Sequence, residues 1–593
     1  MAQKPHKDSS QDQPNDPIEG TLERFTFRNA ETGFAVIRFA PDGAGGPVCA
    51  VGQLSQLAEG QRLRISGPRV DHPRFGIQIQ VESVEAILPT SIDGIRAYLA
   101  SSLVKGIGPA TAEKITDRFG ADTLRVIEME PERLVEVPGL GKKRAAELRD
   151  AVQSQHDVQE VMVFLRAHGL GQALASRIVK HYGKGAAALI QANPFRLADD
   201  VLGIGFKTAD QLATKLGIDE TAPERIQAGT LHGLALSARA GNCYEPRNTI
   251  VQKTAALLGL DHASVDAQLP ELALQGRIHI EKPIELTDTS QPIEESVYPN
   301  TLKIAEDGVA RSIHALARQT FLPMQIHAER SLDQFESDSK MTLPIGQRTA
   351  VLHALANPIS VITGGPGVGK TTIIRAIADI VKHHNHTLLL CAPTGRAAKR
   401  LSESTQHPAS TIHRMLDWQV GTNRFMRDQD TPLEGDLLVV DEASMLDVQL
   451  AYNLLRAIPP SMKLVLVGDV NQLPSVGPGQ VLRDIIDSSV APVTRLDQIF
   501  RQQGESLIVK NAHALLSGGV PESGPEDSDF FYIESRDSQH TRELIHELVV
   551  HRIPKRFGLD PLHDIQVLTP MYRGHAGADL INEGLQGLLN PDG

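Results

Sequence analysis

A glycine-rich loop in the C-terminal half of the chain has the residue types and spacing most clearly suited to chemistry. Residues 364–371, GGPGVGKT, fit the pattern G-x-x-x-x-G-K-T and lie between a β-rich run at 360–363 and an apolar-periodic segment at 372–381. In this strand–loop–helix setting, backbone N–H groups surround phosphates, the lysine neutralises their charge and the threonine hydroxyl binds Mg²⁺. The pattern predicts a site for ATP and Mg²⁺ with the nucleotide-binding residues Gly364, Gly365, Pro366, Gly367, Val368, Gly369, Lys370, Thr371 and Thr372.

Two acidic residues follow the next strongly apolar run. Residues 437–440 are LLVV, which is typical of a buried parallel strand, and Asp441 and Glu442 come directly after them. We expect Asp441 to share the Mg²⁺ ion with Thr371 and Glu442 to orient the attacking water. Gln472 follows a third apolar run, where an amide can sense the γ-phosphate. The residues predicted so far to be catalytic are Lys370, Asp441, Glu442 and Gln472.

These motifs require a parallel sheet that brings the carboxyl ends of several strands to one edge. Residues 336–593 alternate strand-like and helix-like segments, which predicts an α/β fold with such a sheet. We expect a complete P-loop domain at 336–490 and the beginning of a second domain of the same kind at 491–593. In the second domain a strand at 565–570 resembles the first-domain segment that ends in Ala392, Pro393 and Thr394.

The region before the P-loop domain has a different character in each of its parts. Residues 1–17 are polar and predict a disordered tail. Residues 18–90 alternate apolar and polar side chains in five short runs, which favours a small β-barrel, with an OB-like fold as first choice. Residues 221–335 are helical with a strand near 277–281, and both a winged-helix-like unit and a helical connector fit.

Residues 91–220 contain short helices joined by turns of the form apolar–Gly–x–Gly. Such a turn lets two helices approach closely and leaves backbone N–H groups open at the start of the second helix, where a phosphate can bind. The turns resemble those of the helix-hairpin-helix family, which grips the DNA backbone, although purely structural turns are the alternative. A looser copy lies at 168–171. The residues predicted to contact DNA here are Gly106, Gly108, Gly139, Gly141, Lys142, Gly203, Gly205 and Lys207.

The bulk composition excludes several classes of protein. The net charge of −13 argues weakly against a nucleic-acid binder, but residues 391–427 hold six Lys and Arg against two acids, which favours a local channel. The three cysteines, Cys49, Cys243 and Cys391, are too far apart for a disulfide framework or a zinc cluster and indicate a reducing, cytoplasmic location. No apolar stretch is long enough to predict a membrane span.

A short hairpin is predicted within this basic segment. Trp418, the single tryptophan, and Phe425 flank Gly421 and Thr422, a combination typical of a β-hairpin. Aromatic side chains beside arginines can stack on bases or separate the strands of a duplex. Packing of the hairpin on its own domain is the alternative.

Five ordered motifs resemble one helicase family. They are the segments CAPTGRAA at 391–398, TIHR at 411–414, DEASM at 441–445, GDVNQLPSV at 468–476 and LDQIFRQ at 496–502. In order and wording they resemble the motifs of superfamily 1B, specifically RecD-like helicases with a long N-terminal region. The resemblance implies ATP-dependent 5′→3′ translocation on single-stranded DNA, unwinding at single-strand/duplex junctions, and a role in recombination or repair.

The resemblance also implies roles for single residues. Gln347 matches the glutamine that recognises adenine, Gln472 matches the γ-phosphate sensor, and Arg501 matches a catalytic arginine from the second motor domain. Pro-Thr-Gly could be only a turn and His413 only a surface histidine. The residues that match DNA-contacting positions are Pro393, Thr394, Gly395, Arg396, Thr411 and His413, and Thr569 is added from the related segment of the second domain.

The sequence departs from this family at its C-terminal end. Helicases of this type have two RecA-like domains, but here no later motif with the second arginine follows 565–570. We therefore expect either a fragment or a naturally shortened protein, with little unwinding activity. A DNA-binding ATPase that does not unwind is the alternative function. A repair scaffold with a silent P-loop is disfavoured, because Lys370, Asp441 and Glu442 are all present.

Overall fold

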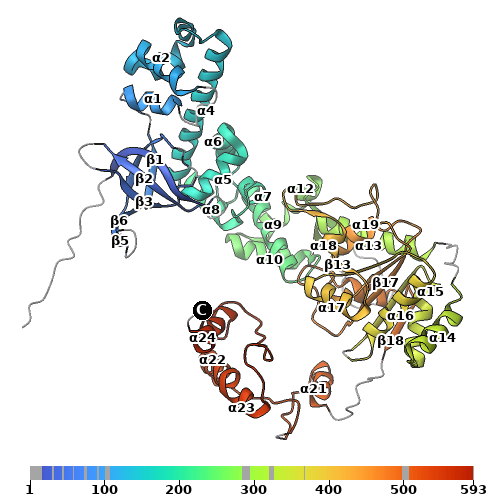
Figure 1. The fold of residues 1–593 in the computed structure, drawn as a ribbon. Coiled ribbons are helices and arrows are strands. Elements are labelled where there is room, and N and C mark those ends of the chain that lie inside the picture. The colour runs from blue at the N-terminus through green and yellow to red at the C-terminus, as the bar shows by residue number, and fades with distance from the viewer. Residues whose placement is uncertain are drawn as a thin grey trace, which may run out of the picture. The chain divides into compact units, whose positions relative to one another are not determined.

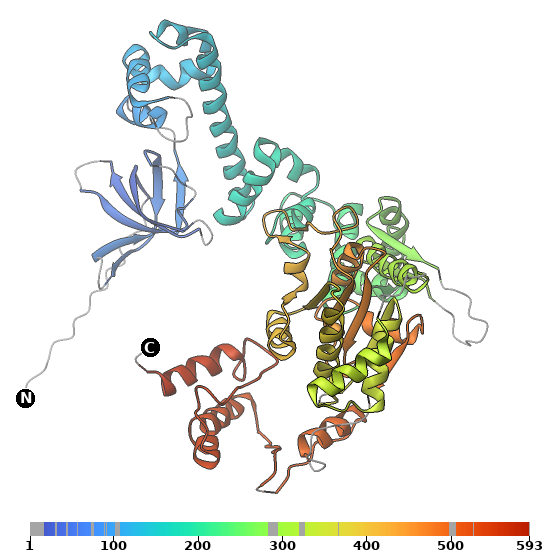
Figure 2. The same ribbon diagram turned by 45° about the vertical axis from the view of Figure 1, so that its right-hand side comes forward.

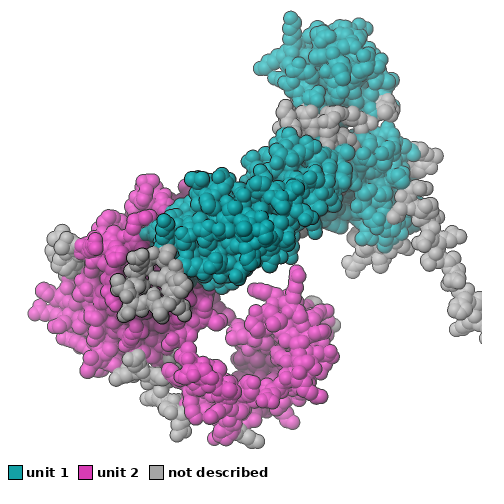
Figure 3. Space-filling view, turned by 180° about the vertical axis from the view of Figure 1, so that it is seen from behind, with its two compact units in different colours: residues 1–307, 476–479 teal, residues 308–475, 480–593 magenta. Residues whose placement is uncertain are grey.

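The computed structural model divides the chain into two compact units, which Figure 3 colours separately. One unit comprises residues 1–307 with 476–479, and the other comprises 308–475 with 480–593. No described helix is long and apolar enough to span a membrane. The structure describes all residues except 1–16, 30–32, 43–45, 56, 58, 73–75, 88, 90–91, 101–106, 283–293, 320–325, 366, 497–505, 526 and 592–593.

The N-terminal segment forms a curled, barrel-like sheet, drawn in blue in Figures 1 and 2. The sheet order is β5-β6-β3-β2-β1-β4-β7. The chain itself links the two sides of this sheet: β6 pairs in parallel with β3, and β7, separated from β6 by two residues, pairs with β4. Leu22, Phe39 and Leu63 fill the interior. The strands are β1 Ile18–Arg28, β2 Ala35–Pro41, β3 Val48–Gly52, β4 Arg62–Ser66, β5 Arg69–His72, β6 Gly76–Gln80 and β7 Ser83–Ala86.

The barrel has seven strands, so the expectation of five was wrong. Two predicted runs are each divided. The first breaks at Gly67, where a side chain would collide with the Gln80 carbonyl, and the second breaks between β6 and β7.

Helices follow, all short except α4 with its 26 residues, and the predicted glycine turns precede four of them. The residue between the two glycines of each turn is apolar and buried: Ile107, Leu140, Leu170 and Ile204. These residues belong to two separate cores, which tie each turn to the helices around it. The helices are α1 Ile92–Ala100, α2 Pro109–Phe119, α3 Thr123–Met129, α4 Lys142–Ala167, α5 Gln172–Tyr182, α6 Ala186–Ala192, α7 Arg196–Asp200 and α8 Phe206–Lys215, with short helical turns η1 Gly120–Asp122, η2 Pro131–Glu136 and η3 Gly183–Gly185.

The next segment combines helices with a three-stranded antiparallel sheet of order β8-β10-β9. Gly229 and Gly233 let α9 pack closely on α10, because a Cβ at either position would come within 2.9 Å of Leu258 or Ile250. The elements are α9 Pro223–Arg239, β8 Glu245–Pro246, α10 Arg247–Leu258, α11 His262–Asp266, α12 Leu269–Leu274, β9 Ile278–Glu281, β10 Ser296–Pro299, α13 Asn300–Ala317 and α14 Ala328–Ser339.

The P-loop domain is built on a six-stranded parallel sheet of order β13-β12-β16-β17-β11-β18. The predicted strand at 437–440 is β16 Leu437–Val440, and all four side chains are buried. The other elements are α15 Ile345–Ala356, β11 Ile359–Gly364, α16 Lys370–His383, β12 Leu388–Ala392, α17 Gly395–Thr405, β13 Ala409–Thr411, α18 Ile412–Met415, β14 Trp418–Gln419, β15 Arg424–Phe425, η4 Ala443–Met445, α19 Val448–Ala457, β17 Lys463–Gly468, α20 Val481–Asp487 and β18 Val493–Leu496.

Two expectations for the C-terminal part were wrong. The first domain extends beyond residue 490, because β18 pairs in parallel with β11 of the P-loop sheet. The strand expected at 565–570 is absent, and Leu568 is 85% exposed. A strand needs a neighbour for its backbone groups, and the described residues after β18 contain no other strand. They contain α21 Leu507–Leu516, α22 Ser538–Glu547, the π-helical η5 Leu548–Arg552, α23 Ile553–Phe557 and α24 Ala578–Leu589.

Candidate nucleotide and nucleic-acid sites

The phosphate-binding loop connects β11 to α16. Gly367 and Gly369 have φ angles of +80° and +89°, a region that side chains other than glycine rarely adopt. Gly369 is also the N-cap of α16, and no side chain caps the helix there. The first backbone N–H groups of α16 are therefore open to an anion. Pro366 lies outside the described residues.

Lys370 lies across this loop. Its Nζ donates to the Gly364 carbonyl at 2.5 Å and to the Gly365 carbonyl at 3.1 Å. The ammonium group is thus held beside the open N–H groups, so a bound triphosphate would contact the ammonium group and the N–H groups together.

One cavity of about 480 Å³ brings together those residues predicted for catalysis and metal binding that the structure describes. It combines the hydroxyl of Thr371 and the carboxyl of Asp441, two hard oxygen donors of the kind Mg²⁺ prefers. Arg400 of α17 also lines it, which the sequence analysis missed. The sequence feature that could have predicted Arg400 as a site residue is its position four residues after Arg396, on the same face of a basic helix. The lining residues are Gly365, Gly367, Gly369, Lys370, Thr371, Thr372, Ala397, Arg400, Leu401, Ser404, Asp441, Glu442 and Gln472.

The two acids at the end of β16 differ in their surroundings. The pKa of Asp441 is raised to about 6, mainly by burial and in smaller part by the Glu442 carboxylate. The Glu442 backbone N–H and the charges of Lys370 and Arg400 act in the opposite direction and lower this pKa. Glu442 has a left-handed backbone with φ +53°, uncommon for a residue with a side chain. Its N–H donates to Asp441 Oδ1 at 2.9 Å. This strained turn directs both carboxyls into one cavity.

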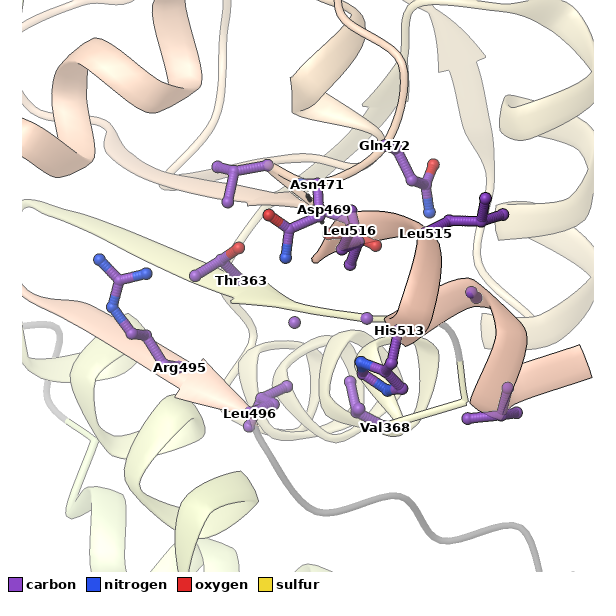
Figure 4. A pocket seen from close by; sticks show the side chains of 15 residues that line it. Thr363, Val368, Asp469, Asn471, Gln472, Arg495, Leu496, His513, Leu515 and Leu516 are labelled. Atoms are coloured by element: carbon purple, nitrogen blue, oxygen red, sulfur yellow. Dashed lines mark hydrogen bonds between the residues drawn. The ribbon is translucent and has the colours of Figure 1, made fainter. Parts of the chain in front are cut away.

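A second cavity, of about 560 Å³, lies on the other side of the loop (Figure 4). Gly365 and Gln472 line both cavities. Around the second one Figure 4 shows Val368 of the loop with His513 and Leu516 of α21. A largely apolar cavity beside a phosphate-binding loop can hold the base of a nucleotide.

Gln347 lies beneath the loop and lines neither cavity. It is 4% exposed, and its Nε2 donates to the Val368 carbonyl at 3.0 Å. A Cβ on Gly369 would collide with the same amide. Gln347 therefore positions the P-loop backbone. Arg501, the proposed catalytic arginine, lies outside the described residues.

Two of the DNA motifs begin helices at neighbouring strand ends. Thr394 caps α17 by accepting from the Ala397 N–H at 3.3 Å, and Thr411 caps α18 by accepting from the Arg414 N–H at 3.2 Å. Strands β12 and β13 are parallel neighbours, with Ala392 opposite Thr411. The structure therefore brings these predicted DNA contacts together, with Pro393, Gly395, Arg396 and His413 in the same two turns. Thr569 lies in neither motif, and its hydroxyl donates to the Ala576 carbonyl at 2.7 Å.

The predicted hairpin is confirmed, with Trp418 opposite Phe425 in the β14–β15 pair. The two rings lie 4.6 Å apart, and the His413 ring lies 6.0 Å from the first and 5.5 Å from the second. The aromatic side chains thus pack on one another and on the His413 motif. At the tip, Val420 is 81% exposed.

The hairpin turns of the helical region share one geometry. In the turns before α4, α5 and α8 the first glycine has a φ angle between +83° and +94°, and the second is an extended N-cap without a side-chain cap. The space around Gly108, Gly141 and Gly205 is open. Lys142, directly after one turn, and Lys207, two residues after the second glycine of another, are exposed. Gly106 lies outside the described residues.

Two of these turns exchange basic side chains, which the sequence did not predict. Arg177 of α5 donates to the Leu202 carbonyl at 3.1 Å, beside the turn that opens α8. Lys215, at the end of α8, lies against Gly169 in the turn that opens α5. Each turn therefore has a cation supplied by the helix that follows the other turn.

Family models match four parts of the chain. The OB-fold domain of the ATP-dependent DNA helicase YrrC matches residues 15–89, and a SAM-like helix-hairpin-helix tandem matches 98–154. The helix-hairpin-helix domain of ATP-dependent RecD2 DNA helicase matches 154–244, and an AAA domain matches 347–478. The predicted fold class is confirmed.

Two relatives in sequence, one from Mycobacterium tuberculosis and one from Deinococcus radiodurans, lead to the same family. The RecD subunit of the RecBCD enzyme from Mycobacterium tuberculosis is 36% identical over 176 residues, 25% of this chain and 30% of that subunit. Among solved structures, the Pif1 helicase from Candida albicans aligns over 36% of this chain and 55% of that one, with 20% identity and a TM-score of 0.26. The ATP-dependent RecD2 DNA helicase of Deinococcus radiodurans is 31% identical over 590 residues, 97% of this chain and 79% of that protein. The resemblance drawn from the motifs is thus confirmed, and the chain belongs to the RecD2 family of ATP-dependent DNA helicases.

Proposed function

We propose that the chain hydrolyses ATP·Mg²⁺ in the cavity between the P-loop and β16, and uses the cycle to move 5′→3′ along single-stranded DNA and unwind duplexes at junctions. The single observation that carries the proposal is the cavity itself. It gathers, from separate strands and one helix, the residues that phosphoryl transfer requires: Lys370, Thr371, Asp441, Glu442 and Gln472.

Each residue has a chemical part in this proposal. Lys370 leaves the two loop carbonyls and neutralises charge on the β- and γ-phosphates. Thr371 and Asp441 bind the Mg²⁺ ion, which stabilises the developing phosphate charge when it is bound. Glu442 orients the attacking water and Gln472 contacts the γ-phosphate. Arg501 completes the set as a charge supplied from the far side of the nucleotide.

The proposed path of single-stranded DNA crosses the ends of β12 and β13. Thr394 and Thr411 lie there on adjacent helix N-termini, where backbone N–H groups favour phosphate oxygens. Exposed Arg396 and His413 add a positive group and an aromatic ring. The Trp418–Phe425 hairpin stands next to His413, and its exposed tip is suited to separate strands at a junction.

The hairpin turns of the helical region supply a second, sequence-independent grip on DNA. Their open N–H groups and exposed Lys142 and Lys207 suit phosphates rather than bases. Binding of this kind weakens steeply with salt because bound counterions are released.

Paired assays test the proposal. Hydrolysis should rise when single-stranded DNA is added, and a duplex with a 5′ single-stranded tail should be displaced faster than one with a 3′ tail. Hydrolysis that DNA stimulates without any displacement would favour the alternative of a DNA-binding ATPase that does not unwind. A preference for the 3′ tail would refute the assigned direction.

A further inference from the structure

One face of α17 forms a wall of the cavity that contains the P-loop and the two acids of β16. The residues of this face that line the cavity are Ala397, Arg400, Leu401 and Ser404. Positions spaced by three or four residues lie above one another on the same side of a helix. Because the other three side chains of the face are uncharged, Arg400 carries the charge that α17 contributes to the cavity.

The same helix begins at the first DNA motif. Thr394 is the N-cap of α17, and its hydroxyl accepts from the Ala397 N–H at 3.3 Å. Ala397 therefore takes part in the cap and also lines the cavity. From Thr394 to Arg400 the helix rises about 9 Å, since each residue adds about 1.5 Å. A single short helix thus joins a proposed contact with single-stranded DNA to the nucleotide cavity.

Two arginines of α17 lie at different sites, one turn apart. Arg396, the second residue of the helix, is exposed beside the Thr394 cap and does not line the cavity. Arg400 is exposed as well, but it does line the cavity. Backbone hydrogen bonds make a helix move as one body. A shift of the helix N-terminus when DNA binds would therefore also shift Arg400 relative to the P-loop.

The guanidinium group of Arg400 has no partner in the described part of the chain, with which it forms neither a hydrogen bond nor an ion pair. Lys399, directly before it, pairs with Glu403 of the same helix at 3.9 Å. Lys370, the other cation of the cavity, donates to two carbonyls of the P-loop. Arg400 is therefore the cation of this cavity that can bind an anion without first breaking a contact.

The charges around the cavity require such a cation. Asp441 and Glu442 supply two carboxyl groups, and ATP·Mg²⁺ is itself negative. Without Arg400, the described lining would have Lys370 as its one positive side chain. Burial raises the pKa of Asp441, and the positive charges of Lys370 and Arg400 lower it, so the guanidinium lies close enough to act on groups inside the cavity.

We propose that Arg400 contacts the γ-phosphate of ATP when single-stranded DNA occupies the N-terminus of α17, and thereby couples DNA binding to hydrolysis. This inference rests on the proposed function of the cavity and assigns the residue that regulates it. A guanidinium can donate to two phosphate oxygens at once, which suits it to the charge that develops on the transferring group. Unlike Arg501, Arg400 belongs to the P-loop domain and to the helix of the DNA motif itself.

Steady-state hydrolysis by the full chain, with Mg²⁺ and with or without saturating oligothymidylate, tests the coupling. We expect the single strand to raise the kcat of the parent chain. Arg400→Ala removes a hydrogen bond to a charged group, so the kcat with DNA should fall by about 10- to 150-fold. The kcat without DNA should fall less. Arg400→Lys keeps the charge without the planar fork and should recover part of the response to DNA.

Arg375→Ala is the matched control for the loss of an arginine. Arg375 lies on α16, is exposed, pairs with Asp379 of its own helix at 3.7 Å and does not line the cavity. This variant should respond to DNA as the parent chain does.

Nucleotide binding distinguishes coupling from a general weakening of the site. The affinities of a non-hydrolysable ATP analogue and of ADP are measured with and without oligothymidylate. By linkage, DNA must change the affinity for the analogue by the same factor by which the analogue changes the affinity for DNA. Arg400→Ala should bring both factors to about one. It should leave the affinity for ADP unchanged, because ADP has no γ-phosphate.

The outcomes separate this inference from the proposed function. A parent chain whose hydrolysis does not respond to single-stranded DNA would refute the proposed function and the coupling together. A parent chain that responds, with equal stimulation in Arg400→Ala, would overturn the role of Arg400 alone. An equal loss of affinity for the ATP analogue and for ADP would overturn the contact with the γ-phosphate.

Discussion

Replacing Gln347 by alanine separates two roles that this residue can have at the nucleotide site. The family resemblance implies that it recognises adenine. In the structure its amide is buried and donates to the Val368 carbonyl within the P-loop. A role in base recognition affects ATP alone, whereas a role in holding the loop affects every nucleoside triphosphate. We expect Gln347→Ala to weaken the binding of ATP and of GTP.

The size of the common loss follows from the hydrogen bond. The substitution leaves a buried carbonyl without its donor, which costs about 1–3 kcal/mol. Because the triphosphate binds the ordered loop, this cost appears in its dissociation constant as a weakening of about 5- to 150-fold. Any further loss for ATP relative to GTP measures the contact with adenine.

Equilibrium binding of fluorescent ATP and GTP analogues, with Mg²⁺, measures both quantities. Gln334→Ala is a suitable control, because this glutamine is exposed on α14 and, among the described residues, its side chain donates to Asp338 of its own helix. Unchanged affinity for GTP in the Gln347→Ala variant would refute the loop-holding role. It would leave recognition of adenine as the sole function of the residue.

Three further predictions address the motor and the hairpin turns. Lys370→Ala should lower ATP hydrolysis, measured by phosphate release, by several powers of ten and leave DNA binding intact. The control Lys382→Ala, on the same helix but away from the cavity, should hydrolyse ATP at the parental rate. Near-parental hydrolysis by Lys370→Ala would contradict the assignment of the site. Gly369→Ala should weaken nucleotide binding more than Gln347→Ala does in the same binding assay. The alanine would combine an unfavourable φ of +89° with a collision against the Gln347 side chain. Equal nucleotide affinity of the two variants would contradict this explanation of the need for glycine at position 369. Lys142→Ala with Lys207→Ala should reduce the salt dependence of duplex binding by a slope of about 1.8 in a filter-binding titration, and an unchanged slope would show that the turns do not touch phosphates.

The parts of the fold that could be predicted depend on local patterns. The run LLVV at 437–440 became β16 with the predicted bounds, because four apolar residues followed by two acids can hardly be placed other than in a buried strand. The P-loop could be predicted with equal certainty, because its glycines are required by the positive φ angles of the loop itself and not by contacts with distant parts of the chain. The hairpin turns were found for the same reason.

The expectations that failed depend on distant partners. Residues 565–570 have a strand-like composition, but no neighbouring strand is present among the described residues to pair with them. β18 was assigned to the wrong domain because its pairing with β11 joins residues far apart in sequence. Gly67 divides a predicted strand only because the Gln80 carbonyl approaches it across the barrel. None of these contacts leaves a periodic signal in the sequence.

The positive side chains that lie beside the hairpin turns at Gly169 and Gly203 also could not be predicted from the sequence. Arg177 and Lys215 lie beside glycine turns to which they are not adjacent in sequence, because each extends from the helix that the other turn begins. A motif search finds the turn and its following lysine, but it cannot find a charge that folding delivers from elsewhere. The turns that open α5 and α8 therefore act as one unit: a substitution of Arg177 alters the electrostatics of the turn at Gly203, and a substitution of Lys215 alters those of the turn at Gly169. Where two motifs share their charges in this way, their contributions to DNA binding are coupled, and single-turn variants will not be additive.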